Sequence, residues 1–138
     1  MKRSHDLIHH FLITAAVLAV LLWGATSPVG NVAMAEGATP MAQMAEIMHR
    51  LKHFPSPQGK ETLKQIVADE STTANQRVLA TAMLNLEHTV DPQDAPKLRA
   101  LMADASASPD EKALAEIILN LDHRPTKQNK ARVKMMMH

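Results

Sequence analysis

The residues best suited to chemistry in this chain are histidines and methionines, because it contains no cysteine. Three histidines, His53, His88 and His123, stand 35 residues apart, and the chain ends in Met135-Met-Met-His138. Imidazole nitrogen and thioether sulfur are ligands for zinc and copper. A soft-metal site is therefore the first chemistry that these residue types indicate.

Geometry argues against one site shared by the three recurrent histidines. Equivalent helices in a stack lie about 8–10 Å apart, whereas a metal ion holds nitrogen ligands at about 2 Å. We therefore expect His53, His88 and His123 to form a row, each near the unpaired carbonyls that end a helix. The better candidates are His49 and His53, which stand at i and i+4 of one predicted helix and can chelate a single ion.

Residue patterns that support catalysis are missing from this sequence. Without cysteine, thiolate nucleophiles and Cys-x-x-Cys-His haem attachment are excluded. No Glu lies between His49 and His53 in the manner of a His-Glu-x-x-His motif, so hydrolysis is not indicated. After residue 36 only Gly37 and Gly59 are glycines, too few for a phosphate-binding loop. We predict a protein without enzymatic activity and without a cofactor.

The elements that must position these residues are the units of a repeat. Residues 63–69 align with residues 98–104, and residues 79–88 align with residues 114–123, without a gap. A fixed period between 20 and 50 residues is typical of stacked helical repeats. The apolar positions that recur, and that we predict to face the core, are Leu63, Leu98 and Val133 in first helices and Leu86 and Leu121 in second helices.

Signals for helix ends recur with the same period. Ser108-Pro-Asp-Glu111 is a capping box with proline at the first helical position, and Thr73-Ala-Asn-Gln76 is its counterpart. Ser56 and Asp91 are predicted to cap the first helices, and Thr126 occupies the same position one period later. Asn85 and Asn120 recur one turn before the predicted helix ends. Because asparagine is a poor helix former, we expect each to bond the following loop or the next unit.

The pattern predicts an all-α fold, a short right-handed α-solenoid of helical hairpins with about six helices. Its parts are a leading helix over 41–53, hairpins over 57–88 and 92–123, and a closing helix over 126–137. Half-repeats at both ends are expected to cover the exposed faces of the stack. Met136 and Met137 are predicted core residues of the closing helix.

The units resemble HEAT-like repeats. Each first helix ends in Ala-Asp, at Ala68-Asp69 and Ala103-Asp104, and a basic residue, Arg77 or Lys112, then precedes the second helix's Leu-Ala. A tetratricopeptide-like resemblance is the alternative, carried by Ala68, Ala80, Leu84 and Pro92. Either resemblance implies a scaffold or a binding surface for another protein or peptide rather than a reaction.

Residues 1–35 are predicted to be a secretory signal peptide. Lys2 and Arg3 precede an apolar run over 11–23, and Ala33-Met-Ala35 offers a cleavage site. The mature domain would then be 36–138, in the periplasm or secreted. An apolar run this short falls below the span of about 20 residues that crosses a membrane. The alternative is an uncleaved anchor that holds the protein at the inner membrane through residues 11–23.

Charge is segregated along the predicted mature chain. Residues 36–123 carry thirteen acidic and eight basic side chains, whereas residues 124–138 carry five basic side chains and no acidic one. We expect the cations to offset the acidic body. Nucleic acid is an unexpected partner, because no stacking aromatics accompany these charges.

These observations predict an exported bacterial protein-interaction or scaffold module. The alternative function is a periplasmic copper- or zinc-binding protein that uses His49, His53 and methionines.

Overall fold

The computed structural model describes residues 37–138, and the predicted signal segment lies outside them. These residues belong to one compact unit and form six α-helices with no β-strand among them. The helices are α1 (Pro40–Arg50), α2 (Pro57–Ala68), α3 (Ala74–Leu84), α4 (Ala95–Ala103), α5 (Pro109–Leu119) and α6 (Lys127–Met135). The predicted all-α fold with six helices is confirmed. Within residues 37–138 no helix is both long enough and apolar enough to cross a membrane.

Four of the five predicted N-caps are confirmed, and they are Ser56, Thr73, Ser108 and Thr126. Thr39 caps α1, although no sequence pattern indicated it. Thr73 and Ser108 form complete capping boxes, in which the cap side chain and the N3 side chain bond each other's backbone N–H. Ser56 and Thr126 accept hydrogen bonds from the N–H groups of Gly59 and Asn129. The caps, rather than helix propensity, therefore fix where these helices begin.

The predicted cap at Asp91 is wrong. The Asp91 carboxylate accepts a hydrogen bond from the N–H of Gln93 at 2.7 Å, and its carbonyl accepts one from the N–H of Asp94 at 3.0 Å. These bonds close a turn, so α4 begins only at Ala95, after Asp94. The Asp94 side chain is buried. Burial raises its pKa, but hydrogen bonds from Lys97 and Asn85 outweigh that influence and leave the pKa below the ordinary value.

The helices of the second type end earlier than predicted. Asn85 and Asn120 are the C-caps of α3 and α5, not residues of the last turn. Asn85 donates a hydrogen bond to the Asp94 carboxylate at 2.7 Å, as expected of a residue that ties one hairpin to the next. Asn120 instead bonds back to the Glu116 carbonyl at 2.9 Å, because the residue one period after Asp94 is Asn129, which lacks a carboxylate.

The core is aliphatic and follows the repeat. Leu63, Leu98 and Val133 have no exposed surface, which confirms the predicted inward face of the first helices. Leu86 and Leu121 are buried too, although both lie just beyond a helix end. The chain therefore keeps its inward register past each helix and into the following loop.

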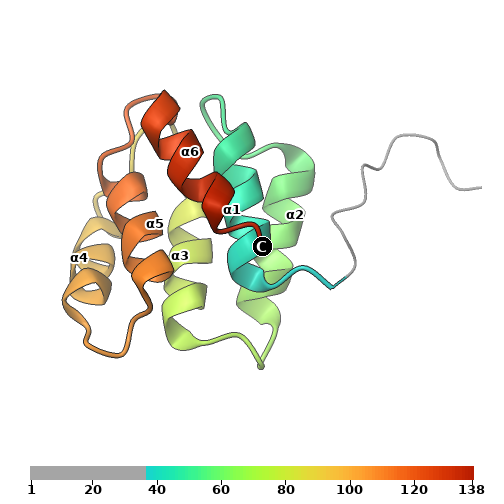
Figure 1. The fold of residues 1–138 in the computed structure, drawn as a ribbon, viewed down its shortest axis with the longest axis vertical. Helices are drawn as coiled ribbons and strands as arrows, with labels where there is room; N and C mark the ends of the chain where they lie inside the picture. Colours follow the sequence, from blue (N-terminus) through green and yellow to red (C-terminus); the bar gives the residue numbers. More distant parts are fainter. Residues whose placement is uncertain (1–36) are drawn as a thin grey trace, which may run out of the picture. The chain divides into compact units, whose positions relative to one another are not determined.

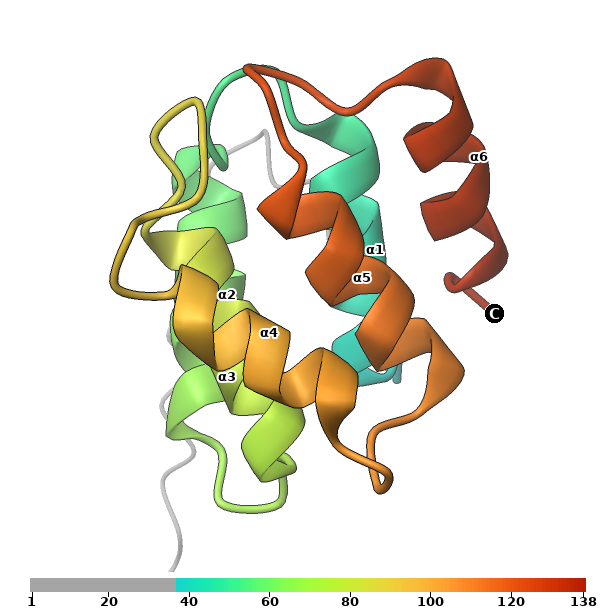
Figure 2. The same cartoon turned by 90° about the vertical axis from the view of Figure 1, so that its left-hand side faces the viewer.

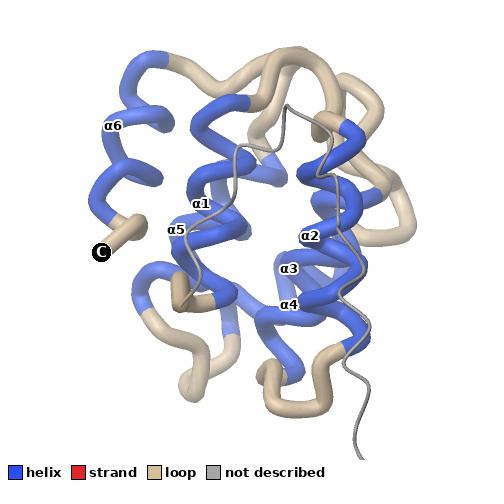
Figure 3. The backbone as a smooth tube through the Cα atoms, turned by 90° about the vertical axis from the view of Figure 1, so that its right-hand side faces the viewer, coloured by secondary structure: helices blue, strands red, loops and turns tan. Residues whose placement is uncertain are grey.

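The two half-repeats pack against each other. Within the hairpins α2 contacts α3 and α4 contacts α5, and in the same way α6 contacts α1. Figures 1 and 2 show α6 lying beside α1, and Figure 3 shows the same pair from the other side. The helices of the second type, α1, α3 and α5, also contact one another pairwise. The half-repeats thus complete a third hairpin instead of covering opposite ends of an open stack.

Apolar faces at both ends of this unit explain the closure. Met44 and Met48 of α1 are fully buried, and Val133 and Met136 at the end of the chain are buried as well. Neither half-repeat can remove these side chains from water alone, and burial of each large one contributes about 1.5–3 kcal/mol. An ion pair between Arg132 of α6 and Glu116 of α5, at 2.8 Å, adds a polar tie.

The packing of α6 on α1 predicts that the Met136 side chain contributes to the stability of the fold and that the Met135 side chain does not. Met136→Ala removes a side chain that is 7% exposed, whereas Met135→Ala removes one that is 72% exposed. We expect Met136→Ala to lower the free energy of unfolding by about 2–5 kcal/mol, and Met135→Ala to change it by less than about 0.5 kcal/mol. Deletion of residues 132–138 should lower the melting temperature further and promote association through the uncovered face. Chemical and thermal denaturation measure both effects, and equal stabilities for the two variants would show that α6 is not a cover.

Candidate functional site

The three recurrent histidines lie together in the structure. The ring centroids of His53 and His88 are 5.3 Å apart, those of His88 and His123 are 5.2 Å apart, and those of His53 and His123 are 6.1 Å apart. The expectation that they form a row is therefore wrong. We call this group the histidine triangle.

The histidine triangle forms because the three residues lie in the loops beyond the helix ends. The backbones of successive loops approach each other more closely than the axes of packed helices do. The N–H of His88 donates to the carbonyl of His53 at 3.2 Å, and the N–H of His123 donates to the carbonyl of His88 at 2.8 Å. Hydrogen-bonded extended segments lie about 4.7–4.9 Å apart, about half the spacing of packed helices. Closure of the hairpins then brings His53 and His123 together as well.

The backbone of the histidine triangle is strained. His88 has φ 73° and His123 has φ 58°, and they are the only non-glycine residues with positive φ in residues 37–138. The N–H of Arg124 also bonds the carbonyl of Asp122 at 2.6 Å, which makes a three-residue turn centred on His123. An L-residue in this region costs about 1–2 kcal/mol, and glycine is the usual solution.

One imidazole of the triangle is oriented by a carboxylate. Nδ1 of His123 lies 2.6 Å from Oδ1 of Asp122. In the neutral ring this bond places the proton on Nδ1 and leaves Nε2 as an acceptor or ligand. The side chains of His123 and Asp122 are 60% and 85% exposed, so Nε2 is open to solvent-borne partners.

The structure does not assemble the predicted set of His49, His53 and methionines. Helix α1 ends at Arg50, so His53 lies outside the helix and does not share a helical face with His49. Met44 and Met48 have no exposed surface, and their sulfurs serve the core. Within residues 37–138 no group of three or more His, Asp or Glu side chains is placed, as it stands, so that it could hold a metal ion.

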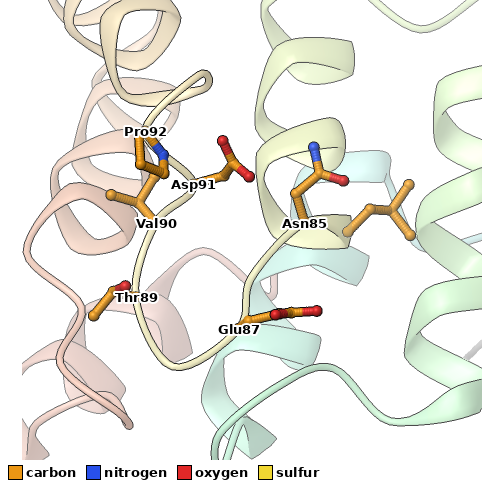
Figure 4. Close-up of a pocket in the computed structure, with 7 residues that line it drawn as sticks. Asn85, Glu87, Thr89, Val90, Asp91 and Pro92 are labelled. Carbon is orange, nitrogen blue, oxygen red and sulfur yellow. The ribbon is translucent and has the colours of Figure 1, made fainter.

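Three shallow hollows flank the loops that carry the histidine triangle. The hollow after α3, about 430 Å³ in volume, is lined by polar residues that include Asn85, Glu87 and Asp91 (Figure 4). The hollow after α5, about 580 Å³, includes Arg124, Lys127 and Lys130. The two hollows thus carry opposite charge although they occupy equivalent places in the repeat.

The third hollow, after α1, is the most apolar and is lined by Arg50, Lys52, His53, Phe54 and Ser56 in a volume of about 340 Å³. Phe54 is the only Phe, Tyr or Trp in residues 37–138, and it is 56% exposed. The ammonium of Lys60 lies 5.9 Å from its ring centroid. Sequence reasoning gave Phe54 no role. The available signal was its position, since the only aromatic residue of the domain immediately follows a recurrent histidine in a polar loop.

Comparisons of this chain with protein-family models, with curated proteins and with solved structures found no match. The HEAT-like and tetratricopeptide-like resemblances therefore stay predictions from the sequence.

The strained backbone predicts an unusual result for glycine substitutions. In His88→Gly and His123→Gly, relief of the positive φ offsets the larger chain entropy of glycine in the unfolded state. We expect the free energy of unfolding to stay the same or to rise by up to about 1 kcal/mol. The control is Gln65→Gly, at an exposed position within α2, which should lower it by about 0.5–1 kcal/mol. If the triangle variants lose as much stability as the control, the rings stabilise the fold and the strain is not the dominant effect.

Proposed function

We propose that this protein is an exported bacterial helical-repeat module, of HEAT-like type, that binds an acidic segment of a partner protein and carries out no reaction. The observation that supports the proposal is the exposed Phe54 inside a hollow lined by Arg50 and Lys52. A closed set of short helices is a rigid support for such a surface.

Phe54 is a candidate anchor for a partner. The core of the described domain is aliphatic, with Met, Leu, Ile, Val and Ala side chains, and the one Phe, Tyr or Trp of residues 37–138 is more than half exposed to water. Aromatic side chains are enriched among the residues that dominate binding energy, because they bury a large area with few rotatable bonds. A half-exposed Phe54 can bury the rest of its ring against a partner.

The charges around Phe54 favour an acidic partner. Lys52 and Arg50 line the hollow, and Lys60 lies over the ring. Arg50 is paired with Glu46 at 2.7 Å, so the two lysines carry most of the uncompensated charge. A segment with one apolar residue next to Asp or Glu would fill the hollow and meet these cations, which also accelerate encounter. A nucleic acid is disfavoured, because within residues 37–138 Phe54 is the only Phe, Tyr or Trp side chain that could stack on a base.

Export is tested by the mature N-terminus. If Ala33-Met-Ala35 is cleaved, the protein recovered from a bacterial envelope should begin at Glu36 and stay in the soluble fraction. Intact-mass analysis and fractionation measure this directly. Retention of Met1 together with recovery in the membrane pellet would instead indicate an anchor through residues 11–23.

Partner chemistry is tested by selecting binders from a random peptide library on the immobilised protein. We expect enriched peptides to combine Asp or Glu with an apolar residue. Phe54→Ala should weaken binding of a synthetic consensus peptide at least about fivefold, as expected for an anchor that contributes more than about 1 kcal/mol. Lys52→Glu should also weaken it, with an effect that falls as salt is added.

The control is Met135→Ala, which removes a more exposed apolar side chain (72%, against 56% for Phe54) from α6, outside the hollow. It should leave peptide affinity unchanged. Enrichment of neutral or basic peptides, or equal affinity of Phe54→Ala and Met135→Ala, would refute the proposed site.

A further inference from the structure

The geometry points to a second site, which shares only His53 with the hollow of the proposed peptide surface: a three-histidine site for one divalent transition-metal ion, zinc or copper, formed by His53, His88 and His123. The three ligands come from three different hairpins, one of which is made by the two ends of the described chain. The bound ion would therefore link all three hairpins.

The spacing of the rings fits one ion. A nitrogen ligand lies about 2.0–2.1 Å from zinc, which places the imidazole centroid about 3.2 Å from the metal. Three such rings at tetrahedral angles have centroids about 5.2 Å apart. Two sides of the histidine triangle, at 5.3 Å and 5.2 Å, already have this length.

Small ring movements would complete the site. The side between His53 and His123 measures 6.1 Å and would have to shorten by about 1 Å. Within residues 37–138 no three His, Asp or Glu side chains are placed, as they stand, to hold a metal ion, so the ring nitrogens must turn toward one point. The rings are tilted or edge-on to one another, with interplanar angles of 51°, 84° and 70°. All three side chains are exposed at the surface, where rotation about their side-chain bonds meets little resistance.

The strained backbone is an independent observation in favour of a ligand role. A helix-terminal position with positive φ is most easily filled by glycine or asparagine. Here histidine fills it at φ 73° and φ 58°, in two units out of three. If these residues served only to end helices, glycine would do so with less strain. The imidazole itself is therefore the feature that these positions provide.

The neighbours of the triangle match those of a metal site. Metal-bound histidine commonly donates its other ring N–H to a carboxylate, which fixes the tautomer and strengthens the ligand. Asp122 holds Nδ1 of His123 in this manner at 2.6 Å. Three nitrogens without sulfur favour Zn²⁺ or Cu²⁺ over Cu⁺, Ca²⁺ and Mg²⁺, and they leave a fourth position for water or another ligand.

The test is titration of the protein expressed from the full chain and purified without a histidine tag, using isothermal calorimetry with ZnCl₂, CuCl₂ and MgCl₂. We expect one Zn²⁺ or Cu²⁺ ion per chain, no binding of Mg²⁺, and a higher melting temperature with the ion present. Each of His53→Ala, His88→Ala and His123→Ala should weaken binding at least tenfold. Asp122→Asn should weaken it less, by about tenfold at most.

Two kinds of control keep the outcome decisive. His49→Ala should leave affinity unchanged. His88→Gly removes a ligand while relieving backbone strain, so loss of metal by this variant cannot be ascribed to unfolding. NMR signals of the rings of His53, His88 and His123 should move together on addition of Zn²⁺.

Absence of stoichiometric binding, or binding that survives His88→Gly, would overturn the proposal. Neither result bears on the peptide surface, whose test uses Phe54→Ala.

Discussion

The packing of α6 on α1 is the contact on which the rest of this structure depends. Each half-repeat is a single helix that lacks the second helix of a hairpin. In an open stack the apolar faces that carry Met44 in α1 and Val133 in α6 would therefore be exposed to water. In the closed arrangement each half-repeat covers the other. The domain has no disulfide and almost no aromatic side chain to compensate for an uncovered face. Burial of aliphatic groups is thus the dominant stabilising term. The contact between α6 and α1 buries the last apolar faces of the domain.

Closure also determines what the loops can do. In an open stack the first and third units lie two helix spacings apart, about 16–20 Å. The rings of His53 and His123 come from those two units, yet their centroids are 6.1 Å apart. Contacts among α1, α3 and α5 carry the ends of these helices to one place, and hydrogen bonds between successive loops draw the histidines closer still.

The sequence predicts the repeat unit far better than the relation between units. The 35-residue period, the capping boxes at Thr73 and Ser108, and the buried positions of Leu86 and Leu121 are local properties, and all appear in the structure. The predicted cap at Asp91 is wrong because its carboxylate closes a turn instead. Aspartate can do either, so the residue type alone does not show whether it will cap a helix or close a turn. The angle between successive hairpins depends on how whole helices pack against one another, so it cannot be predicted from the type of any single residue. A period alone is therefore compatible with an open stack and with a closed one.

The closed arrangement separates two kinds of loop residue. A residue that is the same in every unit is presented three times around one place, as histidine is at His53, His88 and His123, and repetition then yields a convergent set of side chains. A residue that differs between units marks one hairpin only. The position after each histidine is Phe54, Thr89 and Arg124 in turn, so an apolar ring beside cations occurs once. The equivalent positions carry the metal site that we propose, whereas a divergent position, that of Phe54, carries the proposed surface for a protein partner.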